Sequence, residues 1–412
     1  MAEKKRLDNT GRRLYKGENQ QKDGRYRYRW TDKGGRRHTI YADTLEILRS
    51  REDDITRDRL DKINTDKEFQ TVNDVFDRWI DDKVGLKDTT NTNYRYMYNQ
   101  FVRDDIGKKI LTQVTKSMVK NFYNRLATQS GLKVATIDNI HTVLHQVFAC
   151  AVDDDYIRKN PSDGCLTELK RSHNFDTEKK RALTLEEQNL FLDYIRESEQ
   201  YGHWYPIFCV MLGTGLRVGE VTGLRWKDVD EIKGEVRVRQ NLVYYNHRTN
   251  GCYFNVHAPK TDAGVREVPM LDTVREAFRM ERKTQRENNT VCTVTIDGYT
   301  DFVFVNRFGN AQHQGTLNKA LRRIIRDCND EILLRDPNAK VLLPKFSCHT
   351  LRHTFATRMV ENDMNPKALQ AIMGHKDIET TMNIYADATK GFKKQQMEKV
   401  AKAMREKSVA IA

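Results

Sequence analysis

A run from Lys170 to Arg181, KRSHNFDTEKKR, is almost free of apolar side chains and lies inside a chain of 412 residues. Such a run has too little apolar surface to join a core, so it indicates an exposed linker between domains. One hydrophobic core seldom grows beyond about 250–300 residues, which independently requires more than one domain. We expect a separate segment over residues 1–66, a helical domain over 67–168, the linker over 169–181 and a larger domain over 182–412.

The N-terminal segment carries most of the net charge. Residues 1–42 contain thirteen Lys and Arg against five Asp and Glu, which is +8 of the total of +13. Basic side chains gain affinity for a polyanion by displacing counterions from phosphates, so nucleic acid is the expected partner. Composition alone leaves a plain solvated basic surface open as the alternative.

Basic and aromatic residues alternate within this segment. The letters RYRYRW over 25–30, TDKGG over 31–35 and RRHTIY over 36–41 predict two strands joined by a turn. A first strand over 11–16 and a helix begun by a capping box of Asp43 and Glu46 would complete a small antiparallel sheet with one helix. A strand pair of this kind fits the DNA major groove. The arginines expected to bind DNA are Arg25, Arg27, Arg29, Arg36 and Arg37, and a disordered basic arm is the alternative.

The remainder of the chain predicts mainly helices. Apolar residues recur at helical spacing over 71–161, for example in the stripe of Val72, Val75, Phe76 and Trp79. From 183 onward helices dominate again, with strands expected around 236–245, 253–257 and 265–268. The expected fold class is therefore multidomain and mainly α with small β-sheets, ending in a mixed α+β domain.

The location expected for the chain is the cytoplasm. The sequence contains no stretch near the roughly 18 apolar residues that span a bilayer and no secretory signal. Its seven cysteines are widely scattered without a CxxC pair, which argues against a disulfide framework and against a zinc site.

The last domain contains several polar residues whose spacing, considered separately, is also common in residues that have only a structural role. Arg217 and Glu220 are three apart, as in a surface salt bridge on a helix, and His349 and Arg352 have the same spacing. Lys260 is expected at the turn of a hairpin over 258–269. Two further residues stand near the end of the domain: His375 after a helix-ending glycine, and Tyr385 on a short helix over 377–385.

Taken together and in this order, these residues resemble the tyrosine recombinases, also called phage-type integrases. The phrases TGLRVGE, PKTDAGVREVP, HTLRHTFAT and MGHKDIETTMNIYA match the family's arginine box, hairpin lysine, His-x-x-Arg box and His-to-Tyr segment. The basic N-terminal sheet resembles the arm-binding domain of conjugative-transposon and lambda-type integrases, and the helical segment resembles their core-binding, SAM-like domain. The resemblance implies a site-specific recombinase that excises and integrates a mobile genetic element.

The cations of the expected site have a physical reason that is independent of the family. Attack on a phosphodiester builds negative charge on the phosphate oxygens, so fixed positive donors are required. Arg217 and Arg352 can bind the two non-bridging oxygens with planar forks that stay charged. His375 adds one more donor, and Glu220 is expected to hold Arg217 or His349 in place.

Proton transfers explain the other three residues. The nucleophile Tyr385 has an ordinary pKa of about 10, so a base must take its proton, and His349 is the candidate. The leaving 5′ oxygen needs a proton, which Lys260 can give. The product is a 3′-phosphotyrosine, and because one ester replaces another, the bond energy is kept for rejoining. No cofactor and no metal are expected, since the sequence has neither a GxxxxGK[ST] loop nor a compact carboxylate cluster.

The resemblance also implies partners. They are double-stranded DNA at a crossover site and at arm-type repeats, further copies of the chain in a dimer or tetramer, and an excisionase or DNA-bending accessory protein, all in a bacterial cytoplasm. A helical tail over 389–412 either closes its own domain or packs on a neighbouring copy. A type IB topoisomerase shares the same chemistry and is the alternative enzyme, and a DNA-binding regulator is the alternative of another class.

Overall fold

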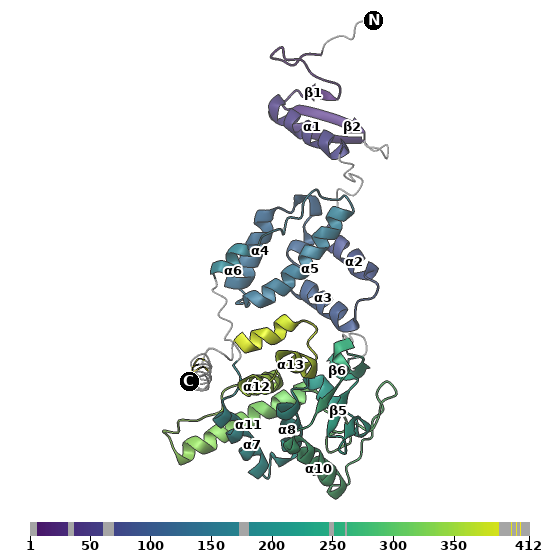
Figure 1. Cartoon of the computed structure of the whole chain (residues 1–412). Helices are drawn as coiled ribbons and strands as arrows, with labels where there is room; N and C mark the ends of the chain where they lie inside the picture. Colours follow the sequence, from purple (N-terminus) through teal and green to yellow (C-terminus); the bar gives the residue numbers. More distant parts are fainter. Residues whose placement is uncertain are drawn as a thin grey trace. The chain divides into compact units, whose positions relative to one another are not determined.

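The computed structural model describes residues 6–31, 37–60, 70–172, 181–246, 251–259 and 262–386, with single positions at 397, 401 and 404. The chain divides into two compact units, Met1–Thr177 and Glu178–Ala412, and each is described by itself (Figure 1). The first unit holds two separate hydrophobic cores, one beneath a small sheet and one among helices. The expected mainly α fold class with small sheets is confirmed.

The N-terminal segment forms a three-stranded antiparallel sheet of order β1-β2-β3 with one helix. Its elements are β1 (Glu18–Gln20), β2 (Tyr26–Thr31), β3 (Arg37–Ala42) and α1 (Leu45–Leu60). Side chains alternate between the faces of a strand, so Tyr26 and Tyr28 face Leu45 and Leu48 of α1 in the core. The intervening basic residues of β2 therefore lie on the opposite face of the sheet.

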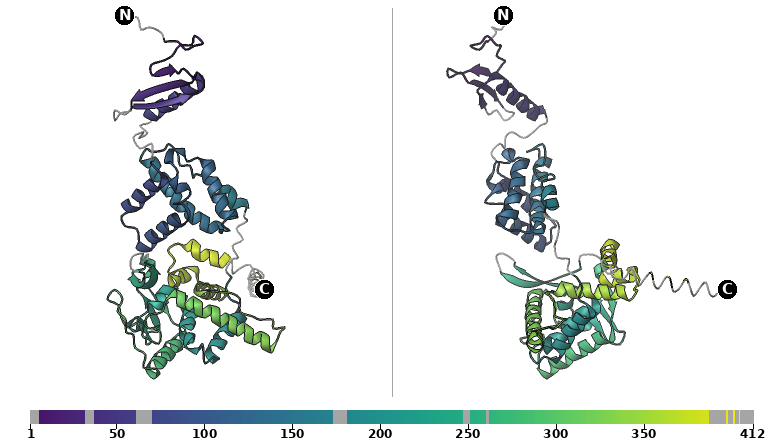
Figure 2. Two further views of the ribbon diagram at one scale, coloured as in Figure 1. Left: turned by 180° about the vertical axis from the view of Figure 1, so that it is seen from behind. Right: turned by 90° about the vertical axis from the view of Figure 1, so that its left-hand side faces the viewer.

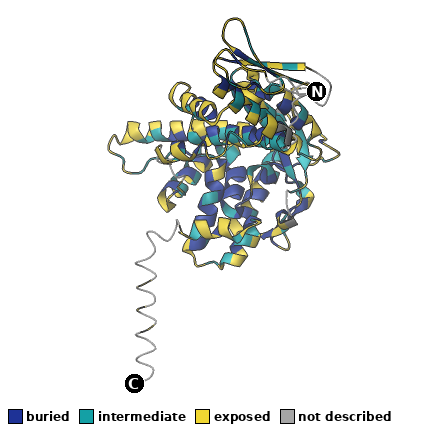
Figure 3. Ribbon diagram, turned by 90° about the horizontal axis from the view of Figure 1, so that it is seen from above, coloured by how far each residue is buried: buried dark blue, intermediate teal, exposed yellow. Residues whose placement is uncertain are grey.

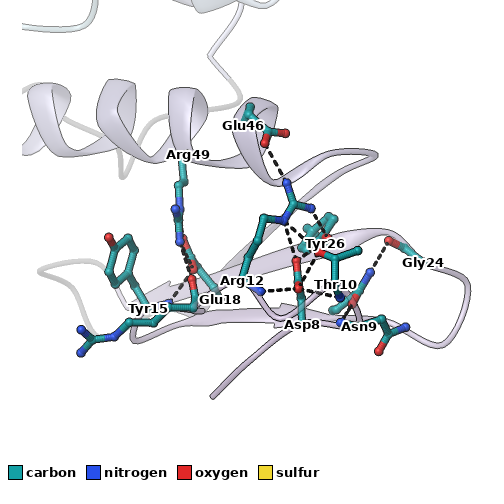
Figure 4. Close-up of polar contacts among 12 residues, drawn as sticks. Asp8, Asn9, Thr10, Arg12, Tyr15, Glu18, Gly24, Tyr26, Glu46 and Arg49 are labelled. Atoms are coloured by element: carbon teal, nitrogen blue, oxygen red, sulfur yellow. Dashed lines mark hydrogen bonds and ion pairs between the residues drawn. The ribbon is translucent and has the colours of Figure 1, made fainter. Parts of the chain in front are cut away.

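The first strand lies later in the chain than the sequence predicted. Residues 8–12 form a turn, because the Asp8 carboxylate accepts the backbone N–H of Thr10 (2.9 Å) and of Arg12 (2.8 Å). The Tyr26 hydroxyl donates to the other Asp8 oxygen at 2.8 Å and ties this turn to the sheet (Figure 4). The strand expected over 11–16 is therefore wrong, and β1 begins only after this anchored turn.

The start of α1 also differs from the expectation. The backbone N–H of Ile47 donates to the Thr44 hydroxyl at 3.3 Å, so Thr44 takes the capping position expected for Asp43. One turn further, Arg49 donates to the fully buried Glu18 at 3.0 Å and fixes the helix to β1 (Figure 4). The helix is thus held to the sheet by a buried ion pair as well as by its apolar face.

The second core of the first unit lies among helices. They are α2 (Val72–Asp82), α3 (Asp88–Phe101), α4 (Lys116–Thr128), α5 (Val134–Asp153) and α6 (Thr167–Ser172), with 3-10 turns η2 (Ile106–Lys108) and η3 (Leu111–Gln113). Thr71 begins α2 with a capping box to Asp74. The Phe76 and Tyr98 rings stack at a centroid distance of 3.6 Å, and both are fully buried. The helical periodicity of this segment thus builds a compact bundle.

The second unit is built around the buried helix α8 (Tyr205–Thr214), which packs against α10 and α12. The other helices are α7 (Leu185–Glu197), α9 (Val218–Thr222), α10 (Asp272–Glu287), α11 (Gln314–Arg335), α12 (Cys348–Glu361) and α13 (Pro366–Met373), followed by a helix over 378–386. The strands are β4 (Val229–Asp230), β5 (Glu235–Val238), β6 (Asn241–Asn246), β7 (Cys252–His257) and β8 (Arg266–Pro269), and the 3-10 turns are η4 (Gly202–Trp204), η5 (Trp226–Asp228) and η6 (Asp262–Gly264). Figure 2 shows this unit from two further sides, and the buried residues are dark blue in Figure 3.

Two strand expectations in this unit are wrong. The strand expected over 236–245 is split at Gln240, whose buried amide donates to Gly223 O (2.8 Å) and to Asp228 (2.9 Å) and so turns the chain from β5 into β6. The hairpin expected over 258–269 does not form either. Instead β7 pairs with β6, and β8 pairs with β5, so the two strands belong to different sheets.

Within the described ranges, none of the helices combines the length and the apolar character needed to span a bilayer.

Candidate active site

Arg217 stands at the junction of two helices. Helix α8 ends at Gly215, which has a left-handed φ of 64°, and Arg217 is the N-cap of α9. Glu220, in the first turn of α9, accepts the Arg217 backbone N–H at 2.8 Å and its Nη1 at 2.9 Å. The Arg217 side chain remains 44% exposed, so its charged head is held in place and still open to a ligand.

Glu220 is a buried carboxylate shared by two arginines. Arg266 at the start of β8 donates to its two oxygens at 3.2 and 2.9 Å. Burial raises the pKa of Glu220, but hydrogen bonds and charge from Arg266, followed by those from Arg217, outweigh it and hold the pKa below its usual value. Glu220 is therefore ionised at neutral pH.

Arg352 lies in the middle of α12 and is only 4% exposed. Its Nη1 donates to Gly215 O and its Nη2 to Met373 O, both at 2.6 Å. The Nη2 of Arg217 donates to Gly374 O, the next carbonyl, at 3.1 Å. The two guanidinium groups therefore meet at one turn, at the carboxyl end of α13.

The electrostatics of this turn favour an anion. Burial, and then the nearby charge of Arg217, lower the pKa of Arg352 to about 9. A cation in this position is short of water and lies close to another cation, so an anion placed between them relieves both penalties. The geometry and the charge thus suit a phosphate group.

His375 follows the same turn. Its Nδ1 lies 2.9 Å from the hydroxyl of the buried Thr381, on the helix over 378–386. Burial, and then the charges of Arg352 and Arg217, lower the pKa of His375 to about 4. The imidazole is therefore neutral at pH 7 and can still donate one hydrogen bond.

Tyr385 is not in the cluster of arginines. Its hydroxyl donates to Met364 O, and its ring packs against the buried group that contains Phe355 and Leu369. Met364 precedes α13 and Gly374 follows it, so a helix of eight residues, about 12 Å at 1.5 Å per residue, separates the phenol from the guanidinium groups. Burial, and then the charge of Asp363, raise the pKa of Tyr385 above its usual value. The phenol therefore lies away from the arginines and is protonated.

His349 and Lys260 are the two remaining residues that the sequence placed in the site. His349 is exposed in the first turn of α12, one turn before Arg352. Lys260 lies outside the described residues. Just beyond it, Gly264 O accepts Arg266 Nη1 at 3.0 Å, and a Cβ on Gly374 would stand 2.9 Å from Ala263 O. The chain that follows Lys260 is thus packed against the turn where the arginines meet.

Comparison with known proteins decides the family. The Phage integrase family matches residues 181–391, and the transposase from transposon Tn916 of Enterococcus faecalis is 31% identical over 402 residues, which is 94% of this chain and 95% of that protein. The chain belongs to the phage integrase family. The family consists of tyrosine recombinases, so the resemblance drawn from the four motifs is confirmed, and with it the assignment as a DNA recombinase.

Other parts of this integrase-family chain have matches of their own. Residues 1–66 match the DNA binding domain of tn916 integrase, and residues 71–127 match the phage integrase N-terminal SAM-like domain. A Tn1549 transposon integrase, solved with transposon right end DNA, is 32% identical with a TM-score of 0.70 over 81% of this chain and all of that one. A lambda integrase dimer is 16% identical with a TM-score of 0.52, over 93% of this chain and 96% of that one, which shows a shared fold.

The arginines of the N-terminal sheet divide by position. Arg27 and Arg29 of β2 and Arg37 of β3 lie on the sheet face opposite α1, with Arg29 paired to Thr39 in the strand register. Arg25 precedes β2 and forms an exposed ion pair of 2.7 Å with Asp23. The fifth, Arg36, lies outside the described residues.

Two residues of the cluster were not singled out from the sequence. Arg266 lies in the motif around Lys260, but its sequence context does not distinguish it from an exposed arginine on a strand. Thr381 lies in the His-to-Tyr phrase, four residues before Tyr385, where a hydroxyl on a short helix carries no signal of its own. Both act on other side chains of the site, which only the folded structure brings near them.

Proposed function

We propose that this chain cuts and rejoins DNA through a 3′-phosphotyrosine at Tyr385, in order to excise and integrate a mobile genetic element such as a conjugative transposon or a phage. The observation that carries the proposal is the meeting of Arg217, Arg352 and the neutral His375 at one turn. Such a set is suited to one phosphate group and its developing negative charge.

In the proposed reaction the scissile phosphate binds at the turn where the two guanidinium groups meet, through N–H groups that they do not donate to the backbone carbonyls. Arg217 and Arg352 bind its non-bridging oxygens, and His375 donates to one of them through the ring nitrogen not facing Thr381. A phosphate there also stabilises the buried guanidinium of Arg352, because it adds negative charge next to a cation whose hydrogen bonds go to neutral backbone carbonyls.

The nucleophile must move before it can react. The Tyr385 hydroxyl leaves Met364 O, reaches the phosphorus in this subunit or an adjacent one, and gives its proton to His349. The bond from the tyrosine oxygen to phosphorus forms while the bond to the 5′ oxygen breaks, and Lys260 protonates that oxygen. The reverse step, by a 5′ hydroxyl of another strand, regenerates the tyrosine.

Three modules provide the DNA contacts in this proposal: an arm-binding domain over 1–66, a core-binding domain over 67–168 and, after the linker, the catalytic domain over 182–412. The family matches over 1–66, 71–127 and 181–391 support this division. Linked modules bind cooperatively because the first contact raises the effective concentration of the next. Arg27, Arg29 and Arg37 of the sheet would contact the arm-type repeats.

The DNA substrate is inferred from relatives. The similar Tn1549 integrase has been solved with transposon right end DNA and with circular intermediate DNA. We infer the same class of substrate here, acted on by a dimer or tetramer in the bacterial cytoplasm, with an excisionase or DNA-bending protein as accessory factor.

A covalent-adduct assay tests the proposal. Wild-type protein mixed with a nicked duplex of its element end should form a covalent complex that survives denaturant, and Tyr385→Phe should bind the same DNA and form none. An adduct with the phenylalanine variant would refute the assignment of the nucleophile. Supercoil relaxation without strand exchange would favour a topoisomerase, and DNA binding without any wild-type adduct would favour a regulator.

A further inference from the structure

Arg266 is a buried cation whose side chain makes four hydrogen bonds within the protein. Its side chain is 7% exposed, and its Nη1 and Nη2 donate to the two oxygens of Glu220. Nη1 also donates to Gly264 O at 3.0 Å, and Nε donates to Ile372 O at 2.6 Å. A guanidinium placed in this way has no open face for a ligand, so it does not itself bind the phosphate.

One partner of Arg266, Glu220, is also a partner of the exposed Arg217. Glu220 Oε1 accepts the Nη1 of both Arg266 and Arg217, and its Oε2 accepts Nη2 of Arg266 and the backbone N–H of Arg217. A carboxylate carries one negative charge, and two guanidinium groups share it here. Because Arg266 balances that charge, the charge of Arg217 is left over for an anion.

Arg266 is also connected to Arg217 and Arg352 through the carboxyl end of α13. Three consecutive carbonyls, those of Ile372, Met373 and Gly374, accept hydrogen bonds from Arg266, Arg352 and Arg217 in that order. The carboxyl end of a helix carries a partial negative charge, which suits three cations. A shift of the first arginine therefore moves the backbone on which the other two are held.

We propose that Arg266 is a positioning residue of the recombination site. It neutralises Glu220 and anchors the end of α13, and by these two contacts it keeps the head of Arg217 aimed and available to the scissile phosphate. The inference rests on the proposed function, since it assigns Arg266 a part in the same reaction.

A charge argument distinguishes this role from plain stabilisation. In Arg266→Met, Glu220 would be left with Arg217 alone, and their ion pair of 2.9 Å would compete with the phosphate for the same guanidinium. Adding Glu220→Gln would remove the competing charge with almost no change of shape. The double variant should therefore react faster than Arg266→Met. If both substitutions only damaged the structure, their effects would add and the double variant would react more slowly.

The experiment measures single-turnover adduct formation at saturating DNA for the full chain, together with thermal unfolding of every variant. Arg266→Met should react about 10–100-fold more slowly, as is common for groups that orient a binding residue. Arg266→Lys should be intermediate, because an ammonium restores the charge but not the planar fork. The matched control is Arg237→Met. Arg237 is a half-buried arginine of the neighbouring strand β5 that forms ion pairs with Asp230 and Glu267. The rate of this variant should stay within about twofold of the wild-type rate.

The outcomes separate the two proposals. Equal rates for Arg266→Met and Arg237→Met, or a double variant slower than Arg266→Met, would overturn the role of Arg266. If Arg266→Met fails to fold, the Arg266→Lys rate decides: a wild-type rate at an unchanged unfolding temperature counts against the inference. Loss of the wild-type adduct, or an adduct with Tyr385→Phe, would instead refute the proposed function itself.

Discussion

Replacing Arg352 with lysine should make the reaction sensitive to pH near neutrality. The native guanidinium is almost fully buried and bridges Gly215 O and Met373 O with two hydrogen bonds of 2.6 Å. A lysine ammonium has one nitrogen and cannot bridge both carbonyls with the same geometry. It would, however, meet the same burial and the same neighbouring charge of Arg217.

The size of the effect follows from the pKa of the arginine. Burial, and then the charge of Arg217, lower the pKa of Arg352 from 12.5 to about 9, a difference of about 3.5. The same burial and neighbouring charge would lower the pKa of a lysine from its ordinary value of about 10.4, which is already below that of arginine. The lysine would therefore lose its proton at a lower pH than the arginine does.

The assay is the second-order rate of adduct formation at subsaturating DNA between pH 6 and 8.5, because that rate reports the ionisation of the free enzyme. The ratio of the Arg352→Lys rate to the wild-type rate should fall as the pH rises, by up to about tenfold per pH unit once the pH exceeds the pKa of the lysine. Saturating DNA should weaken the trend, because a bound phosphate favours the charged form.

The stability of the same variant should change in the opposite direction. A folded pKa below the unfolded value means that the unfolded chain binds more protons between those two pKa values, so the unfolding free energy should rise with pH in that window. A rate ratio that does not change with pH, together with flat stability, would refute the reasoning.

Three further variants follow from the same contacts. Gly374→Ala should lower the unfolding free energy by more than about 1 kcal/mol in denaturant titrations, since the residue has a φ of 62° and its Cβ would stand 2.9 Å from Ala263 O; unchanged stability would contradict the geometry. Thr381→Val removes the hydroxyl beside His375 Nδ1 and should slow adduct formation about tenfold at saturating DNA without changing DNA affinity, whereas an unchanged rate would show that the contact is idle. Arg29→Ala should reduce the slope of log affinity against log salt for arm-type DNA by about 0.9, the contribution of one phosphate contact, and an identical slope would remove the residue from the interface.

The sequence predicted those features that depend on residues close together in the chain. The pairing of Arg217 with Glu220 follows from their spacing, and the strands on both sides of the TDKGG turn follow from alternation. The family resemblance placed Arg352 and His375 in one site, and the structure has both beside the same turn. Their chemical roles remain proposals until the variants are measured.

The sequence could not predict features that depend on distant side chains. The first strand moved because the Tyr26 hydroxyl reaches Asp8 eighteen residues earlier, and the long strand split because the Gln240 amide reaches Asp228. A buried arginine in a strand has no local pattern that distinguishes it from an exposed one, so Arg266 was missed. Likewise, no periodicity indicates that the Tyr385 hydroxyl is bonded to Met364 O.

The three consecutive carbonyls at the end of α13 determine when the anion site can assemble during synthesis of the chain. The arginines that they hold come from α9, β8 and α12, so the donors span residues 217–352 and their acceptors follow at 372–374. A nascent chain that ends before residue 372 therefore lacks these acceptors even though its three arginines are already made. Under the proposed function, such a chain would not hold a phosphate for attack and would not nick the chromosome during its own synthesis.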